Sequence, residues 1–349
     1  MFLSLLPPFL LALLISVLLT PPTIAFAKKF KLLDDPKRHK HPAIIHKKII
    51  PRAGGLPIYL AILVGVIFFI PPSPTFIAIA IAGALVVLIG LADDKYDLSP
   101  YVRFVGNILC AAIVVLIGVH IPFVTNPLGG ILHFSTFSYN FAGIEVSLAG
   151  LLTIAWIVWI MNMLNWSKGV DGQMPGIAAI SAIVIGIASL RFPTLTQTDI
   201  YVAQTSFIVA GAALGFLFYN FYPAKIFPGY SATILGFMLG VLSIMSGVKL
   251  ATAILVMGVP IADGLFTITR RLLARRSPFR HDKGHLHHLL LDLGLKQRTI
   301  AFIYWGMSIL LGLFALNLSS RGKLFAIISV VVFVSAVILT LKFLTKKGE

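Results

Sequence analysis

Two adjacent carboxylates, Asp93 and Asp94, follow directly on an apolar run at 75–92. Carboxylates beside such a run are costly to bury, and they usually mark a functional site. Adjacent carboxylates repel each other unless a cation lies between them, and their hard oxygen atoms suit a Mg²⁺ ion that carries substrate phosphates. The pair therefore predicts a catalytic or metal-binding site. The alternative is a solvated acidic turn that ends one helix, with Ser99 and Pro100 starting the next.

Two asparagines and two glycines form a second candidate group between 161 and 172. Asn162 and Asn165 are three residues apart, so on a helix they share one face and could hold a nucleobase, a sugar amide or a metal. Gly169 and Gly172 allow a tight loop whose backbone N–H groups approach a phosphate. The alternative is that the asparagines only form hydrogen bonds between helices.

Histidine and arginine residues gather in two basic segments. The members are Arg280, His285, His287 and His288 in one segment, and His46 and Arg52 in the other. The first segment could bind phosphate through charge and hydrogen bonds, whereas zinc is the weaker interpretation because the segment lacks thiols and the usual helical spacing. The second could grip a lipid phosphate. Each could also be a solvated basic loop, the second one facing an anionic leaflet.

The composition excludes a soluble globular enzyme and a disordered chain. Of the 349 residues, 58% are hydrophobic and 11% are charged, against about 45–50% and about 25% in soluble domains. The 29 glycines fit closely packed helices in lipid, and they permit a homodimer without requiring one. The class of protein that fits this composition is a membrane protein with several spans.

Eleven apolar runs come close to the roughly 20 residues that a helix needs to cross a bilayer. They lie at about 2–27, 54–70, 75–92, 104–120, 149–165, 176–190, 201–221, 231–247, 250–268, 300–318 and 324–343. We therefore expect an all-α polytopic membrane protein with about 11 transmembrane helices, in a single domain over residues 1–349.

The distribution of Lys and Arg predicts the orientation. Of the 28 Lys and Arg residues, 24 lie on one side of the expected membrane, and the segment 121–148 has none. Cytoplasmic loops carry such an excess of basic residues. This places the N-terminus outside, the C-terminus in the cytoplasm, and the cytoplasmic loops at about 28–53, 93–103, 166–175, 222–230 and 269–299. The formal charge of +16 then reflects topology, and a nucleic-acid partner is unnecessary.

The candidate groups all fall on this cytoplasmic side, although only Lys and Arg define it. Each group then belongs to a different loop at one membrane surface. One site built from several loops is the economical explanation.

These motifs, in this order and on one side of the membrane, resemble those of the polyprenyl-phosphate N-acetylhexosamine-1-phosphate transferases, glycosyltransferase family 4. The similarity covers nearly the whole chain. Five motifs carry it: Asp35-Pro36 with His46 and Pro51-Arg52-Ala53-Gly54-Gly55; Gly90-Leu91-Ala92-Asp93-Asp94 with Leu98-Ser99-Pro100; Asn162, Asn165 and Asp171-Gly172; Asn220 with Pro223-Ala224-Lys225-Ile226-Phe227; and Asp263 with Ser277-Pro278-Phe279 through His285-Leu286-His287-His288. Eleven spans with an outside N-terminus resemble the branch that uses UDP-N-acetylglucosamine.

The resemblance implies a bacterial plasma-membrane enzyme, with its active site on the cytoplasmic face, that moves a sugar-1-phosphate from a UDP-sugar to undecaprenyl or another polyprenyl phosphate and releases UMP. Such a reaction is the first membrane step of cell-wall or surface-glycan synthesis, lipopolysaccharide included. The resemblance implies catalytic roles for Asp93, Asp94 and Asp171, and Mg²⁺ held by Asn165, Asp93 or Asp94. It implies substrate binding by Asn162, Asn165, Asn220, Lys225, His285, His287, His288, Arg280, His46 and Arg52.

Two positions depart from the family's pattern. Where the family has Asp-Gly-x-Asp-Gly, this chain has Lys168-Gly169-Val170-Asp171-Gly172, and Tyr230 stands where the family has a magnesium-binding aspartate. A site that loses two acids and gains an ammonium should bind Mg²⁺ less tightly.

Two hypotheses follow from these departures. In one, the chain remains a transferase, and Lys168 joins the catalytic residues by supplying part of the positive charge for the departing UMP. In the other, the chain is a catalytically silent relative that binds polyprenyl phosphate or scaffolds glycan assembly. A transporter is a weaker third alternative, because no inverted repeat is visible in the sequence.

Overall fold

The computed structural model describes residues 2–37, 45–126, 129–134, 138–141, 144–247, 250–277 and 283–346. Within these ranges the chain forms thirteen α-helices. They are α1 (Leu6–Lys29), α2 (Gly55–Phe69), α3 (Pro74–Tyr96), α4 (Pro100–Leu116), α5 (Leu148–Trp166), α6 (Gln173–Ser189), α7 (Gln197–Asn220), α8 (Thr233–Met245), α9 (Leu250–Val256), α10 (Gly258–Leu273), α11 (Leu286–Asp292), α12 (Gln297–Asn317) and α13 (Ser320–Lys346).

Short elements decorate the helices. A 3-10 helix, η1 (Phe2–Leu5), precedes α1, and six short strands pair as three antiparallel two-stranded sheets within the described ranges. The pairs are β1 (Leu33–Asp34) with β2 (Ile50–Pro51), β3 (Phe123–Thr125) with β4 (Ile131–His133), and β5 (Ser138–Phe141) with β6 (Ile144–Ser147).

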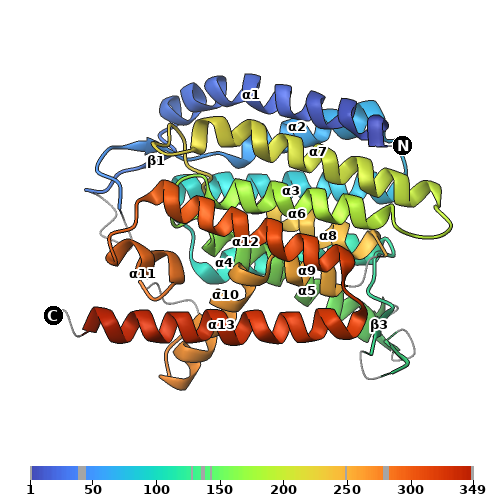
Figure 1. The fold of residues 1–349 in the computed structure, drawn as a ribbon. Coiled ribbons are helices and arrows are strands. Elements are labelled where there is room, and N and C mark those ends of the chain that lie inside the picture. Colours follow the sequence, from blue (N-terminus) through green and yellow to red (C-terminus); the bar gives the residue numbers. More distant parts are fainter. Residues whose placement is uncertain are drawn as a thin grey trace.

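Most helices run side by side in one bundle, and the chain ends lie at opposite ends of it (Figure 1). In this view β1, α11 and the C-terminus lie at the left end, whereas β3 and the N-terminus lie at the right end. The loops predicted to be cytoplasmic, around β1 and α11, are thus at one end of the bundle. The hairpin of β3, from the segment predicted to be outside, is at the other.

Serine caps and prolines start the helices that carry and follow the acid pair. The Ser73 hydroxyl accepts a hydrogen bond from the Phe76 N–H (3.3 Å) at the start of α3. Ser99 caps α4 through the Val102 N–H (3.4 Å), and Pro100 occupies the first turn of that helix. Such caps satisfy N–H groups that have no partner inside the helix. The predicted turn after the acid pair is confirmed, and it packs α4 against α3.

The helices are apolar enough for a polytopic membrane protein. Six have the length and composition of a membrane span, and α9 with α10 form a seventh that is bent by 84°. Four others, α2, α4, α6 and α8, are apolar but only 10–17 residues long. Each of the predicted apolar runs contains a helix, with the run at 250–268 divided between α9 and α10. Whether all eleven cross the membrane, and which way the chain ends face, stay predictions.

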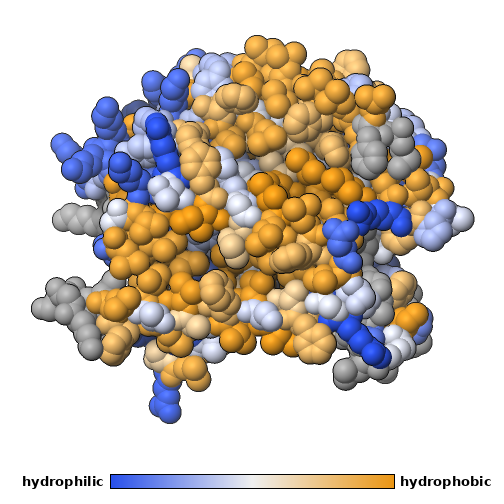
Figure 2. Space-filling view, in the orientation of Figure 1, coloured by the Kyte–Doolittle hydropathy of each residue, from blue (hydrophilic) through white to orange (hydrophobic). Residues whose placement is uncertain are grey.

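The surface has the distribution of polarity that such a bundle requires. Figure 2 shows apolar residues over the middle of the visible face, with hydrophilic residues gathered toward its ends. Most of these hydrophilic residues lie at the upper left, near β1 as placed in Figure 1. A belt of apolar side chains between polar ends suits a hydrocarbon layer.

Helix α8 lies at the centre of the bundle. Every residue from Thr233 to Ser243 is buried, and the helix packs against α3, α5, α6 and α7. Its sequence is apolar on nearly all sides, as expected of a helix that is surrounded by others. Because α8 begins directly after residues 228–232, this buried helix fixes the position of that loop at one end of the bundle.

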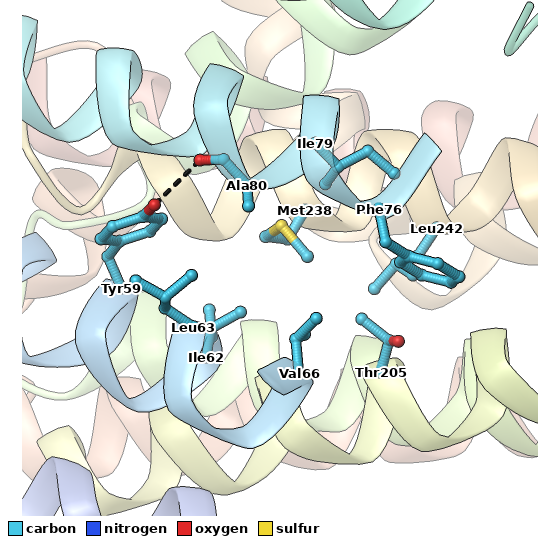
Figure 3. A pocket seen from close by; sticks show the side chains of 10 residues that line it. All are labelled: Tyr59, Ile62, Leu63, Val66, Phe76, Ile79, Ala80, Thr205, Met238 and Leu242. Carbon is cyan, nitrogen blue, oxygen red and sulfur yellow. Dashed lines mark hydrogen bonds between the residues drawn. The ribbon is translucent and has the colours of Figure 1, made fainter. Parts of the chain in front are cut away.

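An apolar pocket lies between α2, α3, α7 and α8 (Figure 3). Its lining residues are Tyr59, Ile62, Leu63, Val66, Phe76, Ile79, Ala80, Thr205, Met238 and Leu242. The Tyr59 hydroxyl donates to the Ala80 carbonyl (2.8 Å), and the Thr205 hydroxyl donates to the Tyr201 carbonyl (2.7 Å). The lining contains none of the predicted site residues, so the site must be sought at the end of the bundle.

Candidate active site

The Asp93–Asp94 pair lies near the C-terminal end of α3 and packs against residues 228–232, which we call the Tyr230 loop. Both carboxylates are buried, each with 4% of its surface exposed. The Asp94 Oδ1 atom accepts the Tyr230 N–H (2.7 Å), and Oδ2 accepts the Ser231 N–H (3.3 Å). Gly90 permits this contact, because a Cβ atom there would lie 2.2 Å from Ser231 Cα. The acid pair and the Tyr230 loop therefore form one rigid unit.

Among the described residues, three basic side chains interact with this pair. The Arg103 Nη1 atom lies 3.4 Å from Asp93 Oδ2. The Lys168 ammonium, from the loop after α5, donates to the Gly229 carbonyl (3.1 Å) and interacts electrostatically with both carboxylates. Arg52 is the third of these cations.

Lys168 itself is in an unusual environment for a lysine. Burial lowers the pKa of Lys168 to about 8, and the negative charge of Asp94 opposes part of this lowering. Lys168 is therefore predominantly protonated at neutral pH, and it loses its charge as the pH rises through about 8.

The Tyr230 side chain packs against two of these cations. Its hydroxyl accepts a hydrogen bond from Asn107 Nδ2 (3.0 Å). The Arg103 guanidinium lies 5.0 Å from the centroid of the Tyr230 ring, and the Lys168 ammonium lies 5.9 Å from it. Both distances suit cation–π contacts. Burial raises the pKa of Tyr230 to about 12, so the phenol stays neutral and does not offer an anionic ligand.

Asp171 and Asn220 join the loop after α5 to the loop after α7. The Asp171 Oδ2 atom accepts the Ala224 N–H (3.0 Å), and burial raises the pKa of this carboxyl. The Asn220 Oδ1 atom accepts the Gly172 N–H (3.0 Å), and Nδ2 donates to the Ile226 carbonyl (2.9 Å). These contacts brace the two loops against each other, and they engage both ends of the Asn220 amide.

The predicted histidine group forms a second cluster. The His285 Nδ1 atom lies 2.9 Å from Asp263 Oδ2, while Asp263 Oδ1 accepts the Leu286 N–H (3.0 Å). The rings of His285 and His287 are stacked with centroids 5.6 Å apart. Burial lowers the pKa of His288 to about 4, and it lowers the pKa of His287 well below its usual value. Both of these rings are therefore neutral at pH 7.

The two clusters meet at residues 168 and 169. A Cβ atom at Gly169 would lie 1.8 Å from His287 Nε2, so only a glycine lets the histidine ring pack here. The residue before it, Lys168, interacts with the acid pair. One short segment thus touches both clusters, with one residue for each.

The other predicted residues have most of their contacts elsewhere. Lys225 is exposed. The Nε2 atom of His46 lies 3.8 Å from Asp34 Oδ1, and His46 also interacts electrostatically with Asp171. Asn162 donates to a carbonyl one turn earlier in its own helix (2.8 Å). Arg280 lies outside the residues that the structure describes. The substrate-binding roles of these residues stay predictions.

Arg52 is held by the first basic loop. Its Nη2 atom lies 3.1 Å from Asp34 Oδ2, and Nε donates to the same oxygen (3.2 Å). This places Arg52 close enough to Lys168 for the two positive charges to interact. The predicted basic segment that contains His46 and Arg52 therefore contributes a cation to the acid-pair cluster.

Two residues of the site were not expected from the sequence. Arg103 follows the Ser99-Pro100 helix start by one turn, and this spacing could have suggested that it folds back toward the acid pair. Nothing in the sequence indicated that Trp305 belongs to the site, because it lies in an apolar run. Its Nε1 atom donates to the Gly172 carbonyl (3.2 Å) and so supports the loop that carries Lys168.

The fold and the site define a polytopic membrane protein with an acid pair, fixed cations and histidines at one end of its bundle. The sequence pattern of glycosyl transferase family 4 matches residues 76–247. A Bacillus subtilis (strain 168) protein named "probable undecaprenyl-phosphate N-acetylglucosaminyl 1-phosphate transferase" is 31% identical over 340 residues, which cover 94% of this chain and 90% of the relative. The chain therefore belongs to glycosyl transferase family 4, as its motifs predicted.

Two further relatives show the breadth of the similarity. A Thermotoga maritima protein named "undecaprenyl-phosphate alpha-N-acetylglucosaminyl 1-phosphate transferase" is 30% identical over 284 residues, covering 79% of this chain and 78% of the relative. A Moorella thermoacetica protein named "phospho-N-acetylmuramoyl-pentapeptide-transferase" is 28% identical over 339 residues, covering 90% of this chain and 98% of the relative. Both similarities extend over most of the bundle.

Proposed function

We propose that this chain is a phosphoglycosyl transferase. It moves N-acetylglucosamine-1-phosphate, or a related N-acetylhexosamine-1-phosphate, from the UDP-sugar to undecaprenyl or another polyprenyl phosphate and releases UMP. The names of the relatives from Bacillus subtilis and Thermotoga maritima support this activity. The alternative of a catalytically silent relative gains no support from those names.

One structural observation carries this proposal. Asp94, Lys168 and the Tyr230 loop converge next to β2, because the Phe227 N–H donates to the Pro51 carbonyl (2.8 Å), and β2 pairs with β1 at one end of the apolar bundle (Figure 1). A water-soluble nucleotide and a lipid phosphate can meet at such an end, because one comes from the aqueous phase and the other from the membrane. Fixed cations there suit the phosphates of both substrates.

The reaction exchanges one phosphorus–oxygen bond for another. An oxygen of the acceptor phosphate bonds to the phosphorus that carries the sugar, and the bond from that phosphorus to UMP breaks. The electron pair remains on the oxygen of the departing UMP, so no net proton transfer is required when the acceptor is a dianion. The protein must therefore position two phosphates and balance their charge.

We assign roles from the contacts in the acid-pair cluster. Lys168 and Arg103 bind the phosphates of the donor. Asp94 is a positioning residue, because both of its oxygens hold the Tyr230 loop. Asp93 keeps one buried oxygen, Oδ1, without a hydrogen-bond partner among the described residues. That oxygen is our candidate to take the proton from an acceptor phosphate that arrives singly ionised.

A direct assay tests the proposed reaction. The purified full chain is mixed with UDP-N-acetylglucosamine and undecaprenyl phosphate, and both UMP and the lipid-linked sugar are quantified. We expect the two products in equal amounts, and no UMP when undecaprenol without phosphate replaces the acceptor. Absence of UMP with every UDP-N-acetylhexosamine would contradict the proposal and favour a binding protein.

We further propose that the bundle crosses a bacterial plasma membrane eleven times, with the N-terminus outside and the active site in the cytoplasm. The excess of Lys and Arg in the loops supports this orientation. A membrane-impermeant maleimide tests it in intact cells. We expect Tyr139→Cys, in β5, to be labelled in intact cells. Lys296→Cys, directly before α12, should be labelled only after the cells are opened. The reverse pattern would contradict the orientation.

A further inference from the structure

Fixed cations already compensate the charge of the acid pair. Asp93 and Asp94 interact with Lys168 and Arg103, and with Arg52, which is also paired with Asp34, so the two negative charges are balanced before any ion binds. A divalent cation placed here would meet ammonium and guanidinium groups as well as carboxylates, and like charges repel it. The cluster is better suited to receive an anion.

Oxygen ligands for a metal are few in this cluster. Both oxygens of Asp94 accept backbone N–H groups, and one oxygen of Asp93 faces Arg103. Asp93 Oδ1 and Asn165 Oδ1 are buried and have no hydrogen-bond partner among the described residues. Magnesium requires a nearly octahedral set of oxygen atoms. Throughout the described ranges, no group of three or more His, Cys, Asp or Glu side chains could hold a metal ion.

The residues present therefore do not fit the Mg²⁺ that the family resemblance implies. The neutral phenol of Tyr230 and the ammonium of Lys168 occupy the space beside the acid pair. Tyr230 also contributes its backbone N–H, rather than an oxygen, to Asp94. This disagreement points to another source of positive charge for the reaction.

Lys168 is held where such a charge is needed. Its ammonium donates to the Gly229 carbonyl (3.1 Å), in the same loop that binds Asp94. An ammonium group has three N–H donors, so it can bind a phosphate oxygen and keep the bond to Gly229. A lysine with a fixed partner loses little further freedom when a substrate binds.

We propose that the Lys168 ammonium, with Arg103 beside it, replaces a divalent cation at the donor diphosphate, so that turnover requires no divalent metal. This inference rests on the proposed function. When the bond from the sugar-bearing phosphorus to UMP breaks, the electron pair stays on the UMP oxygen. An N–H of Lys168 stabilises this charge by a hydrogen bond, and the lysine keeps its proton.

Manganese binding tests the inference without turnover. The full chain in detergent is titrated with Mn²⁺, and bound metal is followed by electron paramagnetic resonance. We expect no saturable site in the wild type, and a site in the double variant Lys168→Asp with Tyr230→Asp, which places two acids beside Asp94. Lys95→Gln, an exposed lysine next to Asp94 in sequence, is the matched control and should behave as the wild type. A saturable Mn²⁺ site in the wild type would overturn the inference.

Nucleotide binding in EDTA tests the role of the lysine directly. Calorimetry should show UMP bound by the wild type, by Lys95→Gln and by Lys168→Arg, whereas Lys168→Gln should bind about tenfold or more weakly. Retention of the fold is checked by thermal unfolding, and Lys168→Arg keeps the test valid if the glutamine variant unfolds. Equal UMP binding by Lys168→Gln and the wild type would overturn the inference.

The UMP-release assay separates this inference from the proposed function. With EDTA present, we expect release by the wild type and a loss of about 10²–10³-fold in Lys168→Gln. If EDTA abolishes release and Mg²⁺ restores it, the inference is wrong and the proposed function stands. If no UMP forms with or without Mg²⁺, the proposed function is wrong, and UMP calorimetry alone then decides the role of Lys168.

Discussion

Two polar clusters meet at one end of this bundle, and they differ in charge: one contains ionised side chains in contact, whereas the other contains neutral histidines. The acid-pair cluster contains opposite charges in contact, with Arg103 3.4 Å from Asp93. In the histidine cluster, burial keeps His287 and His288 neutral. The sequence suggested that the histidines make a cationic phosphate site. In the structure the positive charge lies instead on Lys168 and the arginines, and His287 and His288 are neutral hydrogen-bonding groups.

The largest expected effect is that of Asp94→Asn, which tests whether the acid-pair cluster is the catalytic half. The amide would turn an N–H₂ group toward the Tyr230 or Ser231 N–H, so one donor would lose its acceptor and the loop would shift. We expect UMP release to fall by about 10²–10³-fold. The exposed Asp97→Asn is the control, because asparagine tolerates the left-handed conformation found there (φ 54°). Equal activity of the two variants would show that the acid-pair cluster is not the catalytic one.

The pH profile of UMP release distinguishes the two clusters, because Lys168 changes its protonation state near pH 8 and the two histidines do not change theirs near neutral pH. Because the pKa of Lys168 is about 8, its charge is present below that pH and is lost above it. We expect release to fall by roughly tenfold per pH unit above about pH 8, with no step from His287 or His288 near neutral pH. In Lys168→Arg the fall should move to higher pH, since a guanidinium keeps its charge. If release by Lys168→Arg falls at the same pH as in the wild type, a group other than Lys168 causes the fall.

A smaller effect is expected from Asp263→Asn in the histidine cluster. The change removes the anionic partner of His285 Nδ1 and weakens the contact with the Leu286 N–H. We expect about a tenfold rise in KM for the UDP-sugar, because a charge-assisted hydrogen bond is lost. Asp292→Asn, an exposed carboxylate at the end of α11, is the control. A large fall in kcat at constant KM would place this cluster in the chemical step.

The smallest effect is expected from Trp305→Phe, which probes the support behind both clusters. The variant loses the hydrogen bond from Nε1 to the Gly172 carbonyl (3.2 Å) but keeps most of the apolar surface. We expect a decrease of about 1 kcal/mol in the free energy of unfolding. Thermal unfolding in detergent measures this change. Trp156→Phe is the matched control, because it removes the hydrogen bond from Nε1 to Ser243 Oγ (2.9 Å), far from Gly172 in the chain. A complete loss of activity would show that Trp305 positions Lys168 directly.

Local signals in the sequence predicted the helices well. The Ser99-Pro100 start of α4 is confirmed because its cap forms within three residues. The 84° bend between α9 and α10 was not expected, because hydropathy alone makes 250–268 one apolar run. The residues at the break do carry a signal, since Gly258 begins α10 and Pro260 lies in its first turn, where it has no N–H to bond to the preceding turn.

The sequence by itself determined the class of the molecule and which residues could do chemistry. Apolar runs of bilayer length require helices, because backbone N–H and C=O groups have no other partners in lipid. Polar residues beside such runs are costly, so Asp93 and Asp94 were evident without a structure.

Only the tertiary structure decided which of those residues share a cluster. Lys168 and Asp94 are far apart in the chain, and they meet because the buried helix α8 and Gly90 place the Tyr230 loop against α3. Burial likewise set the charge of His288, whose pKa falls to about 4. Proximity and burial arise from long-range packing, and the acid–base state of each group follows from them.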